Sequence, residues 1–294
     1  MSRPIVIPPK DSPFQVSAAH HTSKNSTSIW NPKMAVSESP VIFGVPGDAQ
    51  PESGCIPDIR KIIRIFEDAG IPCCMAGTSA LVWFGAWRLR CDWEICVLTE
   101  KMSEAVELLK SDPHDKTYQP WMAESFFPGS LAHTWPRFKL RGVSLRFQIF
   151  PSNDSHFDIY EVDRSPSGLP YPKLESYAQS LLDTRRIVGL ADLVDGMNLS
   201  EEWGEKHLDL DKTTDVVYAE QMDAKILASV PPGEDPLDYA GVPAQATPLR
   251  EIWQEIVRGK ERRISVELPV GYFATRFFAH GQGDARLDTS RTYV

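Results

Sequence analysis

Two hydrophobic periodicities alternate along residues 57–150, and this alternation restricts the fold more than any other feature of the chain. Residues 57–69 carry apolar side chains at the spacing of an amphipathic helix. Residues 92–98 and 143–150 instead alternate apolar and polar side chains, which is typical of strands. One short strand and two helices are expected between them, at 71–76, 80–84 and 100–110. The order of helix and strand signals predicts an α/β (α+β) fold with a sheet flanked by helices.

Prolines divide the chain into regions. The chain has 24 prolines in 294 residues, an excess over the usual share of about 5%. They concentrate in residues 1–50, 164–173 and 231–248, and we interpret the last two stretches as connections between packed units. This distribution predicts an irregular or disordered N-terminal arm over 1–50, an α/β core over 54–163 and a mainly helical region over 174–294 that packs on the core. Helical patterns after the core cover 174–199, 213–229 and 248–258.

Composition excludes several classes of protein. Hydrophobic residues make up 42% of the chain and charged residues 24%, which is a globular composition. The formal charge of -9 disfavours a protein that holds nucleic acid mainly through its phosphates. No run of 18 apolar residues occurs, and the start lacks the apolar centre of a signal peptide. We therefore expect no membrane partner and a location in the cytoplasm, with the nucleus as the alternative.

Asp92 and Glu94 are the first candidates for a functional site. Side chains two positions apart on a strand project from the same face, about 6.6 Å apart at ~3.3 Å per residue. Two carboxylates placed in this way repel each other unless a cation lies between them, and Mg²⁺ accepts oxygen ligands of this kind. The pair therefore suggests a metal site. The alternative is a strand whose outer face is simply solvated.

A short turn upstream adds a candidate phosphate site. Gly77, Thr78 and Ser79 lie between an expected strand and an expected helix. A glycine lets the backbone approach a ligand, and the first N–H groups of a helix point toward anions. A triphosphate bridged by Mg²⁺ would then lie between this turn and the acidic strand, with Arg88 or Arg90 near its charge.

Residues 76–97 resemble the signature of the nucleotidyltransferase superfamily. The resemblance is to the branch with minimal and abortive-infection-type enzymes, and to uncharacterised fungal proteins of that fold. The residues on the pattern are Gly77, Ala80, Leu81, Gly85, Arg88, Asp92 and Glu94. The resemblance implies a mixed sheet flanked by helices and transfer of a nucleotidyl group from a nucleoside triphosphate to an acceptor. That acceptor would be a small molecule, a protein or RNA.

The resemblance also implies roles for individual residues. Asp92 and Glu94 would be catalytic and would hold Mg²⁺ or Mn²⁺. The residues that bind the substrate would be Gly77, Thr78, Ser79 and Arg88. Three hypotheses follow: a working nucleotidyltransferase, a catalytically reduced relative that binds a nucleotide or a partner, and a transferase of different chemistry on the same scaffold.

Two features depart from the family pattern. Thr78 stands where the family usually has glycine or serine. The family also places a third acid on a later strand, but the polar face of 143–150 carries only Ser144, Arg146 and Gln148. Asp154 and Asp158 follow that strand in a polar segment that we interpret as a loop. Loss of the third acid would remove the group best suited to activate the acceptor.

Other chemically notable residues have structural interpretations beside the functional ones. Cys73 and Cys74 are adjacent on an expected strand, so they point to opposite faces and cannot ligate the same ion. The chain has five cysteines, and we expect four of them to be buried, small apolar side chains: Cys73, Cys74, Cys91 and Cys96. Trp87, Trp121 or Trp135 either packs in the core or lines an aromatic acceptor pocket. The basic segments 185–186 and 258–263 are either solvated helix ends or contacts for a polyanion.

Overall fold

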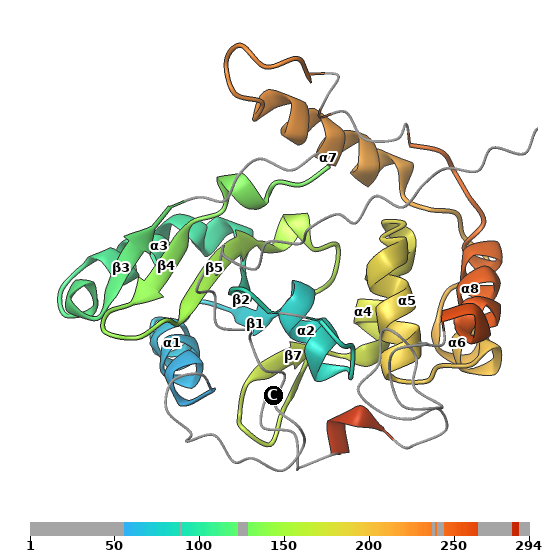
Figure 1. Ribbon diagram of the computed structural model, residues 1–294, viewed down its shortest axis with the longest axis horizontal. Coiled ribbons are helices and arrows are strands. Elements are labelled where there is room, and N and C mark those ends of the chain that lie inside the picture. Colours follow the sequence, from blue (N-terminus) through green and yellow to red (C-terminus); the bar gives the residue numbers. More distant parts are fainter. Residues whose placement is uncertain are drawn as a thin grey trace, which may run out of the picture. The chain divides into compact units, whose positions relative to one another are not determined.

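A computed structural model describes most of the chain after residue 55 (Figure 1). The described residues are 56–88, 90–122, 129–236, 239, 244–263 and 284–287. The predicted N-terminal arm, 1–50, lies outside them. Among the residues that the structure describes, no helix has the length and apolar character needed to span a bilayer.

A five-stranded mixed sheet forms the centre of the α/β part. Its strands are β1 (Cys73–Met75), β2 (Trp93–Val97), β3 (Tyr118–Trp121), β4 (Arg137–Leu140) and β5 (Arg146–Pro151). Their order is β1-β2-β5-β4-β3, with β2 and β5 parallel and the other neighbours antiparallel. The mixed sheet flanked by helices confirms the predicted fold class. The sequence patterns identified β1, β2 and β5 but not the β3–β4 pair.

Three helices accompany this sheet: α1 (Ile56–Asp68), α2 (Gly77–Trp83) and α3 (Met102–Lys110). The apolar stripe of α1 is fully buried, which confirms the helix predicted over 57–69. Helix α2 begins at Gly77 itself, so the predicted turn at 77–79 is the first turn of the helix. Thr99, which lies just before α3 in the sequence, does not cap this helix. Its N–H instead donates to Ser152 Oγ at 3.1 Å, and Lys101 stands at the helix start.

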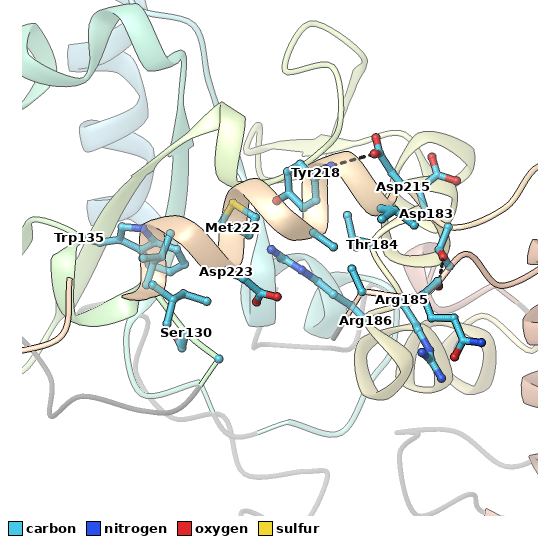
Figure 2. A pocket seen from close by; sticks show the side chains of 18 residues that line it. Ser130, Trp135, Asp183, Thr184, Arg185, Arg186, Asp215, Tyr218, Met222 and Asp223 are labelled. Carbon is cyan, nitrogen blue, oxygen red and sulfur yellow. Dashed lines mark hydrogen bonds between the residues drawn. The ribbon is translucent and has the colours of Figure 1, made fainter. Parts of the chain in front are cut away.

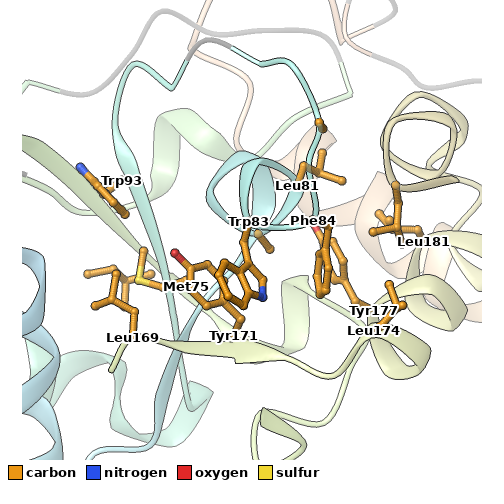
Figure 3. Close-up of a cluster of buried hydrophobic side chains, with 14 of the residues drawn as sticks. Met75, Leu81, Trp83, Phe84, Trp93, Leu169, Tyr171, Leu174, Tyr177 and Leu181 are labelled. Atoms are coloured by element: carbon orange, nitrogen blue, oxygen red, sulfur yellow. The ribbon is translucent and has the colours of Figure 1, made fainter. Parts of the chain in front are cut away.

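The proline-rich segment 164–173 is a hairpin, although its composition predicted a connection. Strands β6 (Val162–Arg164) and β7 (Pro170–Pro172) pair antiparallel in a separate small sheet. Proline is tolerated there because a two-stranded sheet consists only of edges. Leu169 and Tyr171 anchor the hairpin in the core, where the Tyr171 ring stacks on Trp83 at 4.9 Å between centroids (Figure 3).

The described part of the chain after residue 173 is mainly helical, as predicted. It contains α4 (Leu174–Asp183), α5 (Ile187–Gly196), α6 (Glu201–His207), α7 (Val216–Ala228) and α8 (Leu249–Arg258). One buried apolar cluster runs from α1 through the sheet to α8. Figure 3 shows the part of this cluster around α2, β7 and α4. The helical region and the α/β part therefore share a hydrophobic core.

Helices α2 and α5 meet through their backbones. A Cβ atom on Gly196, at the end of α5, would lie 2.4 Å from the carbonyl oxygen of Phe84. Gly85 faces this contact with a φ of +88°, a conformation that only glycine adopts readily. Arg88 adds an ion pair across the same junction, from its Nε to Asp192 Oδ2 at 2.6 Å. Glycines at both positions thus let the helical region approach the core closely.

Candidate functional site

Asp92 directly precedes β2, and Glu94 is the second residue of that strand. Both carboxylates are largely shielded from solvent. Trp93, Ile95 and Val97 project into the main hydrophobic core, as the alternation predicted. The opposite face of the strand is also covered, since Cys96 lies fully buried in a second apolar cluster. The Asp92 side chain is only 10% exposed. A simply solvated strand face therefore does not describe this pair.

Glu94 lies against the first turn of α2. Its Oε2 accepts a hydrogen bond from the Thr78 N–H, and its Oε1 accepts one from Gln148 Nε2 at 2.9 Å. The Glu94 N–H in turn donates to Ser79 Oγ at 3.1 Å. Gly77 leaves room for the carboxylate, because a Cβ atom there would lie 2.4 Å from Oε2. In this arrangement an internal carboxylate occupies the place at the turn that the sequence suggested for a phosphate.

Burial raises the pKa of the Glu94 carboxyl above its ordinary value. Hydrogen bonds from Thr78, Ser79 and Gln148 act in the opposite direction, because they favour the ionised carboxylate. The carboxylate is therefore engaged on several sides by its own chain.

Asp92 is paired with two guanidinium groups. Its Oδ1 lies 3.0 Å from Arg146 Nε, and its Oδ2 lies 3.5 Å from Arg137 Nη1. Only 6% of the Arg137 side chain is exposed. Arg137 also donates from Nε and Nη2 to Gln148 Oε1, at 3.1 and 2.7 Å. The result is a continuous polar network from Asp92 through Arg137 and Gln148 to Glu94.

Sheet register explains how this network forms. Glu94 of β2 is paired with Gln148 of β5, and Gln148 is paired with Arg137 of β4. Directly opposed residues on neighbouring strands lie close enough for their side chains to interact. Three strands thus bring a carboxylate, an amide and a guanidinium group side by side.

The residues in this arrangement do not fit Mg²⁺. That ion prefers oxygen ligands in an octahedral set, whereas Asp92 faces two arginines and Gln148 directs its NH₂ group toward Glu94. Asp154 does not supply the third acid, because it is only 4% exposed and is engaged by Trp135 Nε1 and Lys225 Nζ. Across the described residues, no group of three or more histidine, cysteine or acidic side chains is arranged to hold a metal ion.

Arg88 is engaged by α5, through its ion pair with Asp192. Its partner Asp192 has a side chain that is only 2% exposed. Burial raises the pKa of Asp192, and the hydrogen bond from Arg88 opposes that shift. The structure thus brings Asp92, Glu94 and the 77–79 turn together, but it places Arg88 at the junction of α2 and α5.

Two hollows share lining residues, and the smaller of them adjoins this network through Glu94. The smaller, of about 230 Å³, is lined by Glu94, Thr78 and the aromatic rings of Trp135, Phe150 and Tyr177. The larger, of about 620 Å³, lies between the segment before β4, the turn between α4 and α5, and helix α7 (Figure 2). The two residues that line both are Trp135 and Arg186. We call the larger hollow the α7 cavity.

Some of these residues were visible in the sequence and others were not. Trp135 was a candidate for an aromatic pocket, and Arg186 belonged to a dense basic segment. Arg137, in the polar network, and Asp223, which lines the α7 cavity, were not predicted as site residues. The alternation of Arg137, Phe138, Lys139 and Leu140 after Pro136 is the signal that would have identified β4.

Cysteine reactivity offers a direct check of the sheet. Cys73, Cys74 and Cys96 are buried, as predicted, whereas Cys91 is exposed, which contradicts the prediction for that residue. Burial raises the pKa of Cys73 to about 12, so its reactive thiolate is scarce at pH 8. We expect Cys91 to be alkylated at least tenfold faster than the other three when labelled peptides are mapped by mass spectrometry. Equal rates at Cys73 and Cys91 in the native protein would contradict the burial of β1.

Comparison of the whole chain with known proteins adds nothing to the resemblance of residues 76–97. Neither a protein-family model nor a curated protein sequence matches the chain. A nucleotidyltransferase type therefore stays a prediction, which depends on the resemblance of residues 76–97. Function must be argued from the side chains themselves.

Proposed function

We propose that this chain is a catalytically reduced, nucleotidyltransferase-like protein that binds a nucleotide in the α7 cavity without Mg²⁺. The nucleotide class comes from the resemblance of residues 76–97. The loss of transfer chemistry is argued from the polar network around Asp92 and Glu94.

The observation that carries the proposal is the buried guanidinium group of Arg137. It lies 3.5 Å from Asp92 and donates twice to Gln148. A fixed cation beside the carboxylates supplies the neutralisation that a metal ion would otherwise provide. Gln148 is neutral and cannot act as a general base, so the strand on which the family places its third acid supplies no group that could activate an acceptor.

The α7 cavity has the size and the surfaces that a nucleotide requires. Its volume of about 620 Å³ lies within the range of about 300–1,000 Å³ that is usual for ligand pockets. Trp135 and Tyr218 offer aromatic surface, and Arg186 offers positive charge. Such a combination suits a ring system that carries an anionic group.

A second candidate, Mg²⁺-dependent nucleotidyl transfer, is favoured by the common face of Asp92 and Glu94. For this function Asp92 must leave both arginines, and Thr78 must release Glu94. The two candidates therefore differ in their dependence on metal and in the release of pyrophosphate.

Binding measurements distinguish these candidates. We would measure the affinities of the four nucleoside monophosphates and the four triphosphates by isothermal titration calorimetry, in EDTA and in Mg²⁺. We expect at least one nucleotide to bind, with dissociation constants in the two buffers within about threefold, because Arg137 already neutralises Asp92. Pyrophosphate release from the triphosphates should stay at the level of a blank without protein.

Two outcomes would overturn the proposal. If none of the eight nucleotides binds, the assignment of the ligand class is wrong. If pyrophosphate is released and Asp92→Asn and Glu94→Gln both abolish that release, the chain is a working transferase.

A further inference from the structure

We propose that the α7 cavity selects a nucleoside monophosphate over a triphosphate, with the phosphate on Arg186 and the ribose hydroxyls on Asp223. This inference deepens the proposed function and rests on it.

Charge in the cavity disfavours a triphosphate. Its lining includes three carboxylates, from Asp183, Asp215 and Asp223, and two guanidinium groups, from Arg185 and Arg186. A single phosphate carries about −1.5 to −2 charges near pH 7, and two further phosphates add to this. Without a metal ion, a triphosphate would bring its extra charges among the carboxylates.

Two of the three carboxylates already have partners. His156 Nε2 lies 3.1 Å from Asp215 Oδ2, and His156 Nδ1 lies 3.8 Å from Asp183 Oδ2. Asp183 also accepts a hydrogen bond from Gln179 Nε2 at 2.6 Å. Asp223, on α7, makes no hydrogen bond or ion pair with other described residues. Asp223 is therefore the carboxylate that remains available to a ligand.

Arg186 is the cation directed into the cavity. Figure 2 shows its side chain extending between Tyr218 and Asp223, while Arg185 points away from them. One end of the Arg186 guanidinium group is fixed, because Nη2 donates to the carbonyl oxygen of Asp154 at 2.9 Å. An arginine has five N–H donors, so others remain for a phosphate.

Trp135 provides a fixed aromatic surface on the other side of the cavity. Its Nε1 donates to Asp154 Oδ2 at 3.1 Å, and its ring stacks on Phe150 at 4.7 Å between centroids. Asp154 is itself held by Lys225 Nζ at 2.9 Å. A rigid ring is suited to stack with a nucleobase. Carboxylates bind the hydroxyls of ribose in other nucleotide sites, which is the role inferred for Asp223.

A comparison of ligands that differ by single groups tests the phosphate position. The probes are the best-bound of the four nucleoside monophosphates, its nucleoside and its triphosphate, measured by calorimetry in EDTA. We expect the monophosphate to bind at least tenfold more tightly than either of the others. Arg186→Gln should weaken monophosphate binding at least tenfold and leave nucleoside binding unchanged. Arg185→Gln is the matched control and should change the monophosphate affinity less than threefold.

The ribose position is tested in the same way with the 2′,3′-dideoxy monophosphate. Wild-type protein should bind it about tenfold more weakly than the parent monophosphate, and Asp223→Asn should reduce this difference to less than threefold. Circular dichroism confirms that each variant is folded, and Arg186→Lys should recover part of the preference for the phosphate.

The failures of the two proposals can be told apart. If no nucleoside or nucleotide binds, the proposed function is wrong. The inference alone is wrong if nucleotides bind but the triphosphate is preferred in EDTA. It is also wrong if Arg186→Gln weakens the nucleoside and the monophosphate equally, because Arg186 would then act on the fold and not on the phosphate.

Discussion

Replacing Arg137 with methionine is expected to lower the free energy of unfolding by about 3–5 kcal/mol, the usual cost of removing one partner of a buried ion pair. Methionine keeps most of the side-chain volume but removes the cation. Among its described partners, Asp92, whose side chain is 10% exposed, would then keep only Arg146, which is 41% exposed. Gln148 Oε1 would lose both of its donors. Urea denaturation followed by tryptophan fluorescence measures the loss.

Two variants separate this effect from a general loss of a charged residue. Arg141→Met removes an exposed arginine that contacts Gln119, and we expect it to cost less than about 1 kcal/mol. The double variant Arg137→Met/Asp92→Asn should recover part of the stability, because it no longer leaves a buried carboxylate unpaired. If Arg137→Met unfolds at the urea concentration of the wild type, the polar network does not support the fold in the way described.

Replacing Gly196 with alanine is expected to cost about 3 kcal/mol, at the upper end of the ordinary range for overpacking. The added Cβ atom would lie 2.4 Å from Phe84 O and 2.9 Å from Ala86 N. Both are backbone atoms and cannot move aside as a flexible side chain would. Helices α2 and α5 would have to separate, and buried contacts between the core and the helical region would be lost. Thermal and urea unfolding measure the effect.

Gly189 provides a matched control within the same helix. A Cβ atom there would lie 3.2 Å from Leu181 Cδ2 and 3.8 Å from Leu81 Cδ1, both of which belong to flexible side chains. Alanine also gains about 1 kcal/mol over glycine in helix propensity. Gly189→Ala should therefore change stability by less than about 1 kcal/mol. Equal losses from Gly189→Ala and Gly196→Ala would show that the close approach at Phe84 is not what restricts position 196.

The junction of α2 and α5 explains two residues of the sequence signature, Gly85 and Arg88, in structural terms. Gly85 faces Gly196 across the junction of α2 and α5, and Arg88 pairs with Asp192 on α5. Both residues thus join the helical region to the α/β core. The spacing from Gly85 to Arg88 is explained by packing and by one ion pair, independently of any ligand.

The sequence predicted the elements whose signal is local. The buried stripe of α1, the alternation of β2 and β5, and the amphipathic α8 are all written in consecutive residues. The side-chain period of a helix or strand is a property of the backbone, so it can be recognised without knowledge of the partner. The α/β class, the main helices and the buried β-strand cysteines follow from this.

Other features depended on residues that are distant in the chain. The hairpin at 164–173 forms because Leu169 and Tyr171 find a hydrophobic core to enter, which overrides a composition typical of loops. The break between α4 and α5 falls at Arg185, where φ is +52°. No local pattern distinguishes such a break from a continuous helix over 174–199.

The candidate site shows most clearly the difference between features set by local sequence and features set by distant residues. Its residue types were predictable: Asp92 and Glu94 on one strand, and Gly77 before a helix. Their partners were decided by the register of three strands, which places Arg137 and Gln148 beside the carboxylates. The sequence by itself determined which side chains lie on a common face. Only the tertiary structure decided their charge balance, because pairing between strands depends on long-range packing and not on neighbours in the chain.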